Sequence, residues 1–272
     1  MYDDDAKTIQ RMAPLLKRVL IVDPNPASAR LIGDVMRQLL QCQVWTASDA
    51  RKALAMTETV DAQIIFVELS GPGVDGIDFT RKLRRSHVPC RQAPVVVVTA
   101  TATAQAILGA RDAGVHEFLR KPYTTKDLLR RLEAVTLRKR DWIEAVAYIG
   151  PDRRRFNSGD YSGPLKRKSD AADTPDAARI EQALKILRSA VAAVASDPVQ
   201  ALRAMQAQAA DLSVASASIK DPTLAAATAD FQRYLAAVAA RKAPFSAQEV
   251  AVQAKALLSL LPKDPPAKTA AA

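Results

Sequence analysis

The chain has 272 residues, enough for two ordinary domains, and its hydrophobic content of 49% is usual for globular proteins. No run approaches the roughly 18 apolar residues of a membrane-spanning helix, and the acidic start lacks the basic and apolar segments of a signal peptide. The two cysteines, Cys42 and Cys90, form neither a disulfide framework nor a metal-binding pattern, so we expect a cytoplasmic protein without a transmembrane segment. The net charge of +10 favours anionic partners, namely nucleic acid, a nucleotide, an acidic protein face or a membrane surface.

After residues 1–16, which we expect to be disordered, five short apolar runs alternate with five amphipathic helical patterns over residues 17–140. The expected strands are Arg18–Asp23, Gln43–Thr46, Ile64–Glu68, Pro94–Thr99 and Val115–Leu119. The expected helices are Ala27–Leu40, Ser48–Thr57, Ile77–Ser86, Ala104–Ala113 and a last helix that Thr124 or Thr125 caps. This alternation predicts an α/β domain with a doubly wound, five-stranded parallel sheet.

The third apolar run ends at Glu68, and a turn rich in glycine and proline follows at once. Such a run, bounded by turn residues, is typical of a strand that is buried on both faces of a parallel sheet. Sites in these sheets form at the carboxyl ends of the strands. Glu68 is therefore expected where chemistry usually takes place, and Asp23 ends the first run in the same way.

The second half of the chain has a different composition. Residues 141–173 are rich in Gly, Pro, Ser, Asp, Arg and Lys, which predicts a basic linker. Residues 174–262 are rich in alanine and contain four helix-start signals, at Thr174-Pro175, Asp197-Pro198, Asp221-Pro222 and Ser246–Glu249. We therefore expect an all-α helical bundle of four helices, followed by a disordered tail at 263–272.

Four short motifs follow the expected strands in order. They are Val22-Asp23, Glu68-Leu69 with Pro72 and Asp75-Gly76 behind it, Thr99-Ala100, and Lys121-Pro122. With these motifs at its strand ends, the first domain resembles the receiver domain of two-component response regulators, which has the flavodoxin/CheY-like fold. The resemblance implies phosphorelay signal transduction, in which a histidine kinase supplies a phosphoryl group to a carboxylate and Mg²⁺ assists.

The resemblance also implies roles for individual residues. Glu68 stands at the phospho-acceptor position, and Asp23 belongs to the acidic pocket. Thr99 is the switch hydroxyl, Lys121 is the cation that pairs with phosphate, and Phe118 is the switch aromatic. Taken alone, Thr99 is equally typical of a loop cap and Phe118 of core packing.

Two positions depart from the family pattern. The acceptor is a glutamate, whose extra methylene brings the carboxylate nearer to Thr99 and Lys121, and Pro24 replaces a second carboxylate. Because Mg²⁺ prefers near-octahedral oxygen ligands, we expect weak Mg²⁺ binding and no required cofactor. We predict a pseudo-receiver that is not phosphorylated at Glu68, whose charge is either phosphomimetic or a plain partner of Lys121. A regulator that is still phosphorylatable is an alternative.

Arg153, Arg154 and Arg155 form a cationic cluster in the linker, beside Tyr148 and Asp152. Clustered arginines near an aromatic ring and a carboxylate can bind guanine bases or phosphates. An effector of cyclic di-GMP or of another nucleotide is therefore a further alternative, and a solvated basic linker is the simpler interpretation.

The helical half indicates a partner rather than a reaction. Residues 174–272 contain no histidine, which excludes phosphotransfer of the histidine type, and no basic recognition face, which disfavours DNA binding. We expect no enzymatic activity and a function through protein–protein contact. The candidate partners are a histidine kinase, a motor or other regulatory protein, and a second copy of the chain in a homodimer.

Overall fold

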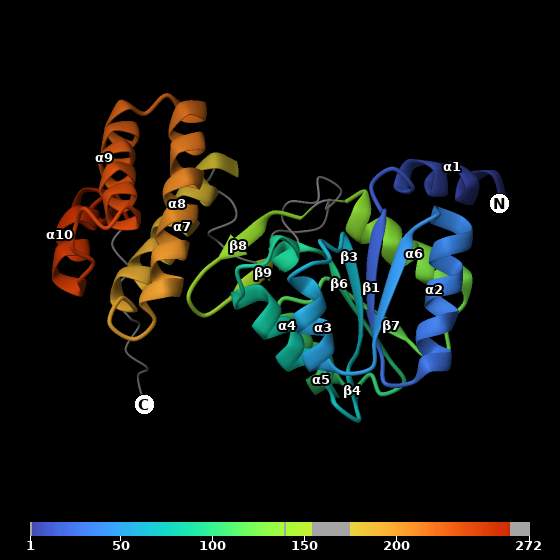
Figure 1. Cartoon of the computed structure of the whole chain (residues 1–272). Coiled ribbons are helices and arrows are strands. Elements are labelled where there is room, and N and C mark those ends of the chain that lie inside the picture. The colour runs from blue at the N-terminus through green and yellow to red at the C-terminus, as the bar shows by residue number, and fades with distance from the viewer. Residues whose placement is uncertain (1, 139, 154–174, 262–272) are drawn as a thin grey trace, which may run out of the picture. The chain divides into compact units, whose positions relative to one another are not determined.

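The structure is a computed structural model that describes residues 2–138, 140–153 and 175–261 (Figure 1). These residues form two compact units. The first runs to Ile143 and also includes Tyr148–Arg153. The second consists of Glu144–Ala147 together with the C-terminal helices.

The first unit is built on a parallel sheet of five strands in the order β2-β1-β3-β6-β7. The strands are β1 (Arg18–Val22), β2 (Gln43–Ala47), β3 (Ile64–Glu68), β6 (Val95–Thr99) and β7 (Glu117–Arg120). The three central strands are nearly continuous apolar runs, because helices cover both of their faces and no face is left for polar residues. The predicted α/β fold with a five-stranded parallel sheet is confirmed.

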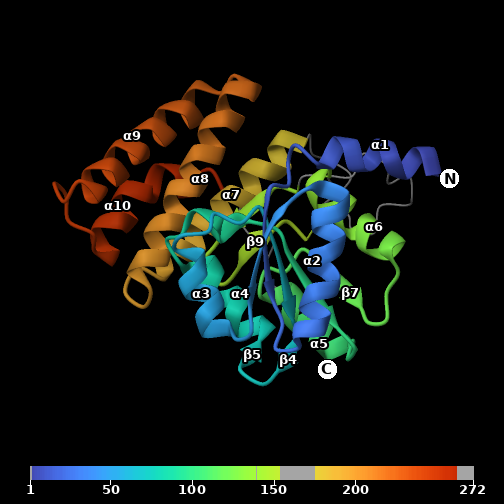
Figure 2. The same cartoon turned by 45° about the vertical axis from the view of Figure 1, so that its right-hand side comes forward.

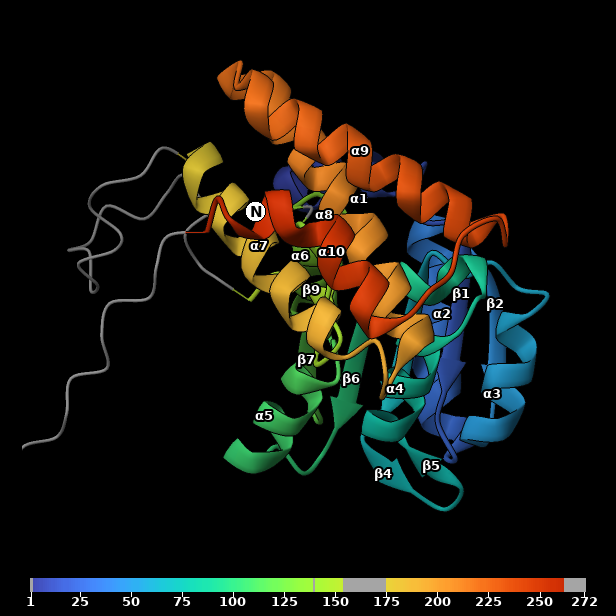
Figure 3. The same cartoon turned by 90° about the vertical axis from the view of Figure 1, so that its left-hand side faces the viewer.

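Helices cover the sheet in two layers, one on each face (Figures 2 and 3). The helices are α2 (Pro26–Leu40), α3 (Ala50–Thr57), α4 (Gly76–Arg85), α5 (Ala104–Asp112) and α6 (Thr125–Thr136). Side chains of α2 and α6 share one apolar cluster with Val19 and Phe66, whereas those of α3, α4 and α5 share a second cluster with Leu20 and Val97. Adjacent residues of one strand thus enter different clusters, as the twofold period of a strand requires.

The ends of these helices follow the expected capping chemistry, with one difference. Thr124 caps α6 in a reciprocal capping box with Asp127, and Gly114, with φ of 90°, follows the end of α5 as predicted. The predicted cap at Ser48 is wrong. Asp49 caps α3 instead, because its carboxylate accepts a hydrogen bond of 2.8 Å from the backbone N–H three residues later.

An additional helix, α1 (Tyr2–Met12), corrects the expectation that residues 1–16 are disordered. The acidic start of the chain obscured an apolar spacing of Ile9, Met12, Ala13 and Leu16. Met12 and Leu16 are fully buried in the cluster that α2 and α6 share, and Ile9 and Ala13 pack against it. Burial of this stripe is what fixes the helix, because an isolated helix of this length is marginal in water.

A small hairpin occupies the first part of the predicted linker and corrects that assignment over residues 142–151. Its strands are β8 (Trp142–Glu144) and β9 (Ile149–Pro151). Glycine is needed where this hairpin approaches the turn after α5, because a Cβ on Gly114 would lie 2.3 Å from the carbonyl oxygen of Ile149. The rest of the predicted linker, residues 154–173, lies outside the described residues, as does the predicted tail at 263–272.

The C-terminal helices are α7 (Pro175–Ala192), α8 (Pro198–Ile219), α9 (Pro222–Ala239) and α10 (Ala247–Leu258). Helix α8 packs against α7 and α9, and α10 also packs against both, so the four helices surround one core. Every helix buries large apolar side chains there, among them Leu187, Met205, Phe231 and Leu257. Side-chain caps confirm the starts predicted at Asp197, Asp221 and Ser246. Among all described residues, no helix is both long and apolar enough to cross a membrane.

Candidate functional site

Three charged side chains meet at the carboxyl edge of the sheet. Asp23 follows β1, Glu68 ends β3, and Lys121 follows β7. The ammonium nitrogen of Lys121 lies 2.9 Å from Oδ2 of Asp23 and 2.7 Å from Oε2 of Glu68. The side chains of Asp23, Glu68 and Lys121 are only 4%, 11% and 23% exposed, so solvent screens this ion pair weakly. Parallel strands bring these distant residues together because their carboxyl ends share one edge.

Each of the two carboxylates is bound at both of its oxygens. The backbone N–H of Asn25 donates to Oδ1 of Asp23 over 2.8 Å, and the N–H of Leu69 donates to Oε1 of Glu68 over 2.9 Å. The remaining oxygen of each carboxylate accepts from Lys121. Each of the four carboxylate oxygens therefore has a hydrogen-bond donor within the chain, while the two carboxylates and one ammonium together carry a net negative charge. The two backbone donors could not be predicted, because every residue except proline carries such a donor.

The surroundings of Lys121 favour its charged form. Burial alone lowers the pKa of Lys121, but the hydrogen bonds and negative charges of Glu68 and Asp23 outweigh burial and raise this pKa above its usual value of 10.5. The sign of the linkage follows directly. The contribution of Lys121 to stability is fully present below pH 10.5 and is lost as the pH rises through the raised folded-state pKa.

The Lys121→Met variant is expected to be less stable than the wild type by about 2 kcal/mol near neutral pH, because two neighbouring carboxylates lose their shared partner. The difference should shrink as the pH rises above 10.5 and through the raised folded-state pKa, where the wild-type ammonium also loses its charge. Urea unfolding of both proteins from about pH 8 to about pH 11.5 measures the difference. A difference that stays constant over this range would contradict the ion-pair account.

The pocket fits a magnesium ion poorly. Pro24 offers no side-chain oxygen, and its ring lies against Gly71, where an added Cβ would stand 2.7 Å from Cγ of Pro24. Lys121 already holds one oxygen of each remaining carboxylate. Within the described part of the chain, no group of three or more His, Cys, Asp or Glu side chains is placed to hold a metal. The residues present form an ion pair rather than a cage of oxygen ligands.

Thr99 lies at the carboxyl end of β6, and Phe118 lies on β7, an edge strand of the same sheet. Thr99 ends β6, and its carbonyl accepts from the N–H of Lys121 over 2.8 Å, which joins the ends of β6 and β7. Its hydroxyl accepts from the N–H of Thr101 over 3.2 Å. Over the residues described, no hydrogen bond joins this hydroxyl to Glu68, although the longer side chain predicted a closer approach. Phe118 on β7 is half-buried and packs against the cluster that α3, α4 and α5 share.

Arg153 lies apart from this pocket. Its guanidinium carbon lies 3.6 Å from the centroid of the Tyr148 ring, and its Nη1 lies 2.5 Å from Oδ1 of Asp112, the last residue of α5. Arg154 and Arg155 lie outside the described residues. Because Arg153 already has an aromatic and a carboxylate partner within the chain, its geometry favours a structural role over nucleotide binding.

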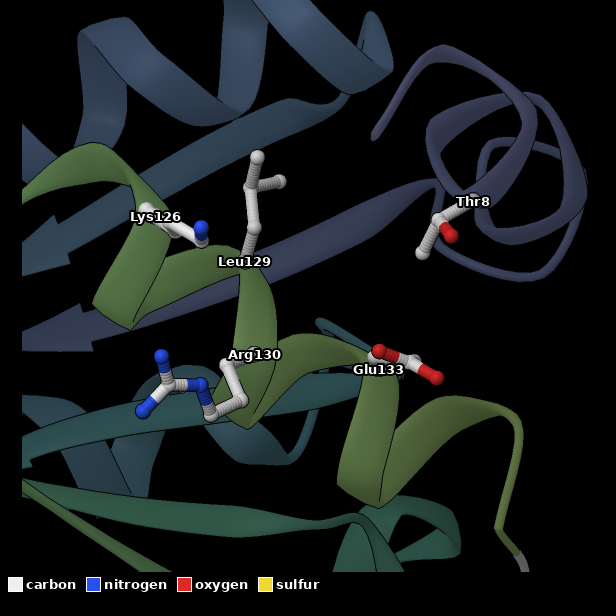
Figure 4. A pocket seen from close by; sticks show the side chains of 5 residues that line it. All are labelled: Thr8, Lys126, Leu129, Arg130 and Glu133. Carbon is white, nitrogen blue, oxygen red and sulfur yellow. The ribbon is translucent and has the colours of Figure 1, made fainter. Parts of the chain in front are cut away.

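A separate hollow lies between α1 and α6 (Figure 4). Thr8 of α1 lines it from one side, and Lys126, Leu129, Arg130 and Glu133 of α6 line it from the other. Its volume of about 110 Å³ is well below the range of usual ligand pockets, about 300–1,000 Å³. The cationic side chains Lys126 and Arg130 are exposed to solvent, so the hollow does not enclose either charged group.

Comparisons with known proteins bear on the first unit. The profile of the response regulator receiver domain matches residues 19–133. The chemotaxis protein CheY of Pseudomonas aeruginosa is 30% identical over 118 residues, which span 43% of this chain and 94% of that protein. This chain belongs to the response regulator receiver family. The family profile ends at residue 133, before the β8–β9 hairpin and helices α7–α10.

Other relatives match the receiver to a similar degree. Chemotaxis protein CheY-3 of Vibrio cholerae is 29% identical over 118 residues, 43% of this chain and 90% of that protein. The DNA-binding dual master transcriptional regulator RpaA of Synechocystis is 30% identical over 132 residues, which span 48% of this chain and 54% of that regulator. A solved signal receiver domain from Bermanella marisrubri is 30% identical, covers 44% of this chain and 98% of its own, and has a TM-score of 0.40.

Proposed function

We propose that this protein is an atypical response regulator that signals in the cytoplasm through protein–protein contact and is not phosphorylated at Glu68. One observation carries the proposal. Lys121 binds both Asp23 and Glu68, and backbone N–H groups hold the other oxygen of each carboxylate. In the family pattern the lysine contacts the phosphoryl group that the acceptor carries. Here the side chain at the acceptor position is itself the partner of the lysine.

Charge balance supports the same proposal. Phosphoryl transfer needs a cation that neutralises the charge of the transferred group, and Mg²⁺ is the usual one. Pro24 removes a carboxylate that would help to hold this ion, and the ion pair with Lys121 occupies the two that are left. Glu68 then acts as a fixed charge. Since the hydroxyl of Thr99 bonds to the chain at Thr101, we assign Glu68 as an ion-pair partner rather than as a full mimic of a phosphoryl group.

The contact surface of the proposal consists of α5, β7 and α6. Helix α5 exposes two neighbouring large apolar side chains, Ile107 at 42% and Leu108 at 50%, and Phe118 lies half-buried on the edge strand β7. Exposed apolar side chains that lie together are typical of surfaces that bind another protein. A histidine kinase or a motor or regulatory protein is the kind of partner that the receiver family implies.

The double variant Ile107→Asp/Leu108→Asp tests this surface. With the full chain as bait in lysate of its native cell, we expect the variant to retain about tenfold less of the proteins that the wild type retains, because charge replaces apolar contact area. Leu15→Asp is the matched control, since Leu15 is 50% exposed but lies before β1. Quantitative mass spectrometry of the eluates gives the ratio. Equal retention of these proteins by the double variant and by the control would refute the assignment of this surface as the contact site.

A further inference from the structure

Helix α1 belongs to the receiver unit but lies outside residues 19–133, the part of the chain that the receiver profile matches. It packs against α2 and α6, and residues 13–17 join it to β1 (Figures 1 and 2). None of the three residues of the Asp23–Glu68–Lys121 pocket lies on α1. The helix is therefore an addition to the receiver with no part in the chemistry of the pocket.

A narrow apolar stripe holds α1 in place. From Ala6 to Met12, Met12 is fully buried, Thr8 and Ile9 are partly buried, and the other side chains of this stretch are exposed. Leu16 adds a second fully buried side chain just beyond the helix. Because an isolated helix of 11 residues is marginal in water, α1 depends on this stripe for its helical structure.

The fit between α1 and α6 is incomplete. The hollow of about 110 Å³ separates Thr8 of α1 from Lys126, Leu129 and Glu133 of α6 (Figure 4). Side chains across such a gap lose the close contacts that stabilise a packed interior. The two helices therefore hold each other less firmly at this end of α1 than at the end that carries Met12.

The backbone is fixed again immediately after this segment. The N–H groups of Lys17 and Arg18 donate to Oε1 of Gln63 over 2.6 and 3.0 Å, and the carbonyl of Lys17 accepts from the N–H of Gln43 over 2.8 Å. These bonds join the start of β1 to its two neighbours in the sheet. Rotation about the backbone bonds of Leu16 can therefore release α1 without a change in β1.

Cys42 lies beneath the end of this segment. It is 6% exposed, its thiol donates to the carbonyl of Leu16 over 3.1 Å, and it belongs to the same apolar cluster as Met12. The other cysteine, Cys90, is 2% exposed and belongs to the cluster on the opposite face of the sheet. Burial raises the pKa of both thiols. The chain thus carries one buried thiol under α1 and a comparable one away from it.

We propose that α1 is a cover that opens on its own while the rest of the receiver stays folded, and that its opening exposes apolar side chains of α2 and α6. Detachment removes the contacts of Met12 and Leu16, and the released helix then unfolds. Local opening of this kind costs less free energy than global unfolding. The cover would control access to one flank of α6. This inference goes beyond the proposed function, because it depends neither on the pocket nor on a partner.

The reaction of the folded full chain with an aromatic disulfide reagent tests the proposal. Peptide mass spectrometry assigns each modified thiol, and the rate for each thiol is divided by its rate in the unfolded chain. We expect Cys42 to react at least about tenfold faster than Cys90, because opening of α1 exposes Cys42 alone. Met12→Ala leaves a cavity in the stripe, so it should speed the reaction of Cys42 by about tenfold or more and leave that of Cys90 unchanged.

Leu15→Ala is the matched control. Leu15 lies next to Leu16 but is 50% exposed, so its truncation should leave both rates unchanged. Hydrogen exchange gives a second measurement: Met12→Ala should speed exchange of residues 6–16 and not of β1. If Met12→Ala speeds both thiols alike, α1 unfolds together with the receiver and the proposal is wrong. If it speeds neither, α1 does not cover Cys42 and the proposal also fails. No phosphoryl donor or partner is used, so failure here is separate from failure of the proposed function.

Discussion

Replacement of Arg84 by methionine is expected to lower the free energy of unfolding of the receiver by about 3–5 kcal/mol. The guanidinium donates to carbonyl oxygens of Arg91 and Ala93, in the turn that precedes β6, and of Gly114, after α5, and so ties two separate segments to α4. Methionine fills a similar volume but donates no hydrogen bond, and each carbonyl left unpaired costs about 1–3 kcal/mol. Relief from the cost of burying the charge offsets part of this loss. Urea unfolding followed by tryptophan fluorescence measures the change, because Trp142 packs on Arg84.

Two substitutions on the same helix calibrate this result. Arg81 is exposed on α4, so Arg81→Met should change the free energy of unfolding by no more than about 0.5 kcal/mol. Arg84→Lys keeps the charge, but a single ammonium cannot reach carbonyls on both sides of the site, so we expect an intermediate loss. If Arg84→Met were as mild as Arg81→Met, the carbonyls would have found other donors and Arg84 would not organise this region.

The pocket could be predicted from the sequence because its residues stand at the ends of buried strands. Asp23 and Glu68 each close an apolar run, and Lys121 follows the last of the five. Once alternating helices had indicated a parallel sheet, the carboxyl ends of the strands had to meet at one edge. The fold and the placement of Asp23 and Glu68 thus followed from one pattern, whereas the role of Lys121 was implied by the resemblance to the receiver family, and the structure brings all three side chains together.

The hairpin and its arginine could not be predicted in this way. Arg84 lies in a run of arginines that is typical of a solvated face. It donates its hydrogen bonds to backbone carbonyls, and since every residue has one, the sequence does not indicate which carbonyls accept them. The ring face of Trp142 contacts the guanidinium of Arg84, and the segment around Trp142 has the composition of a linker. Helix α1 was missed for a related reason, because the acidic start concealed the apolar spacing of its later residues. Tertiary contacts decided the structure of all three segments.

Acetyl phosphate with Mg²⁺ is expected to leave the wild-type chain unmodified and to add one phosphoryl group to the variant Pro24→Asp/Glu68→Asp. The first substitution restores a carboxylate for the metal ion at the position where the Pro24 ring now lies on Gly71. The second shortens the acceptor by one methylene and withdraws it from Lys121, to which Glu68 is now bound at 2.7 Å. Lys121 can then pair with phosphoryl oxygens, and acetate leaves as the shortened carboxylate takes the group. Intact-mass spectrometry detects the product.

Partial variants separate the two defects of the pocket. Pro24→Asp alone should gain Mg²⁺ binding in calorimetric titration but no phosphoryl group, since Glu68 still holds Lys121. Pro24→Asp/Glu68→Asn should bind the ion and accept nothing, which shows that any added mass in the repaired variant depends on the carboxylate at position 68. A phosphoryl mass on the wild type that disappears in Glu68→Gln would overturn the proposed function. If Pro24→Asp/Glu68→Asp binds Mg²⁺ but stays unmodified, the metal ligand and the acceptor carboxylate are both present. The geometry around Lys121 would then be what prevents phosphorylation.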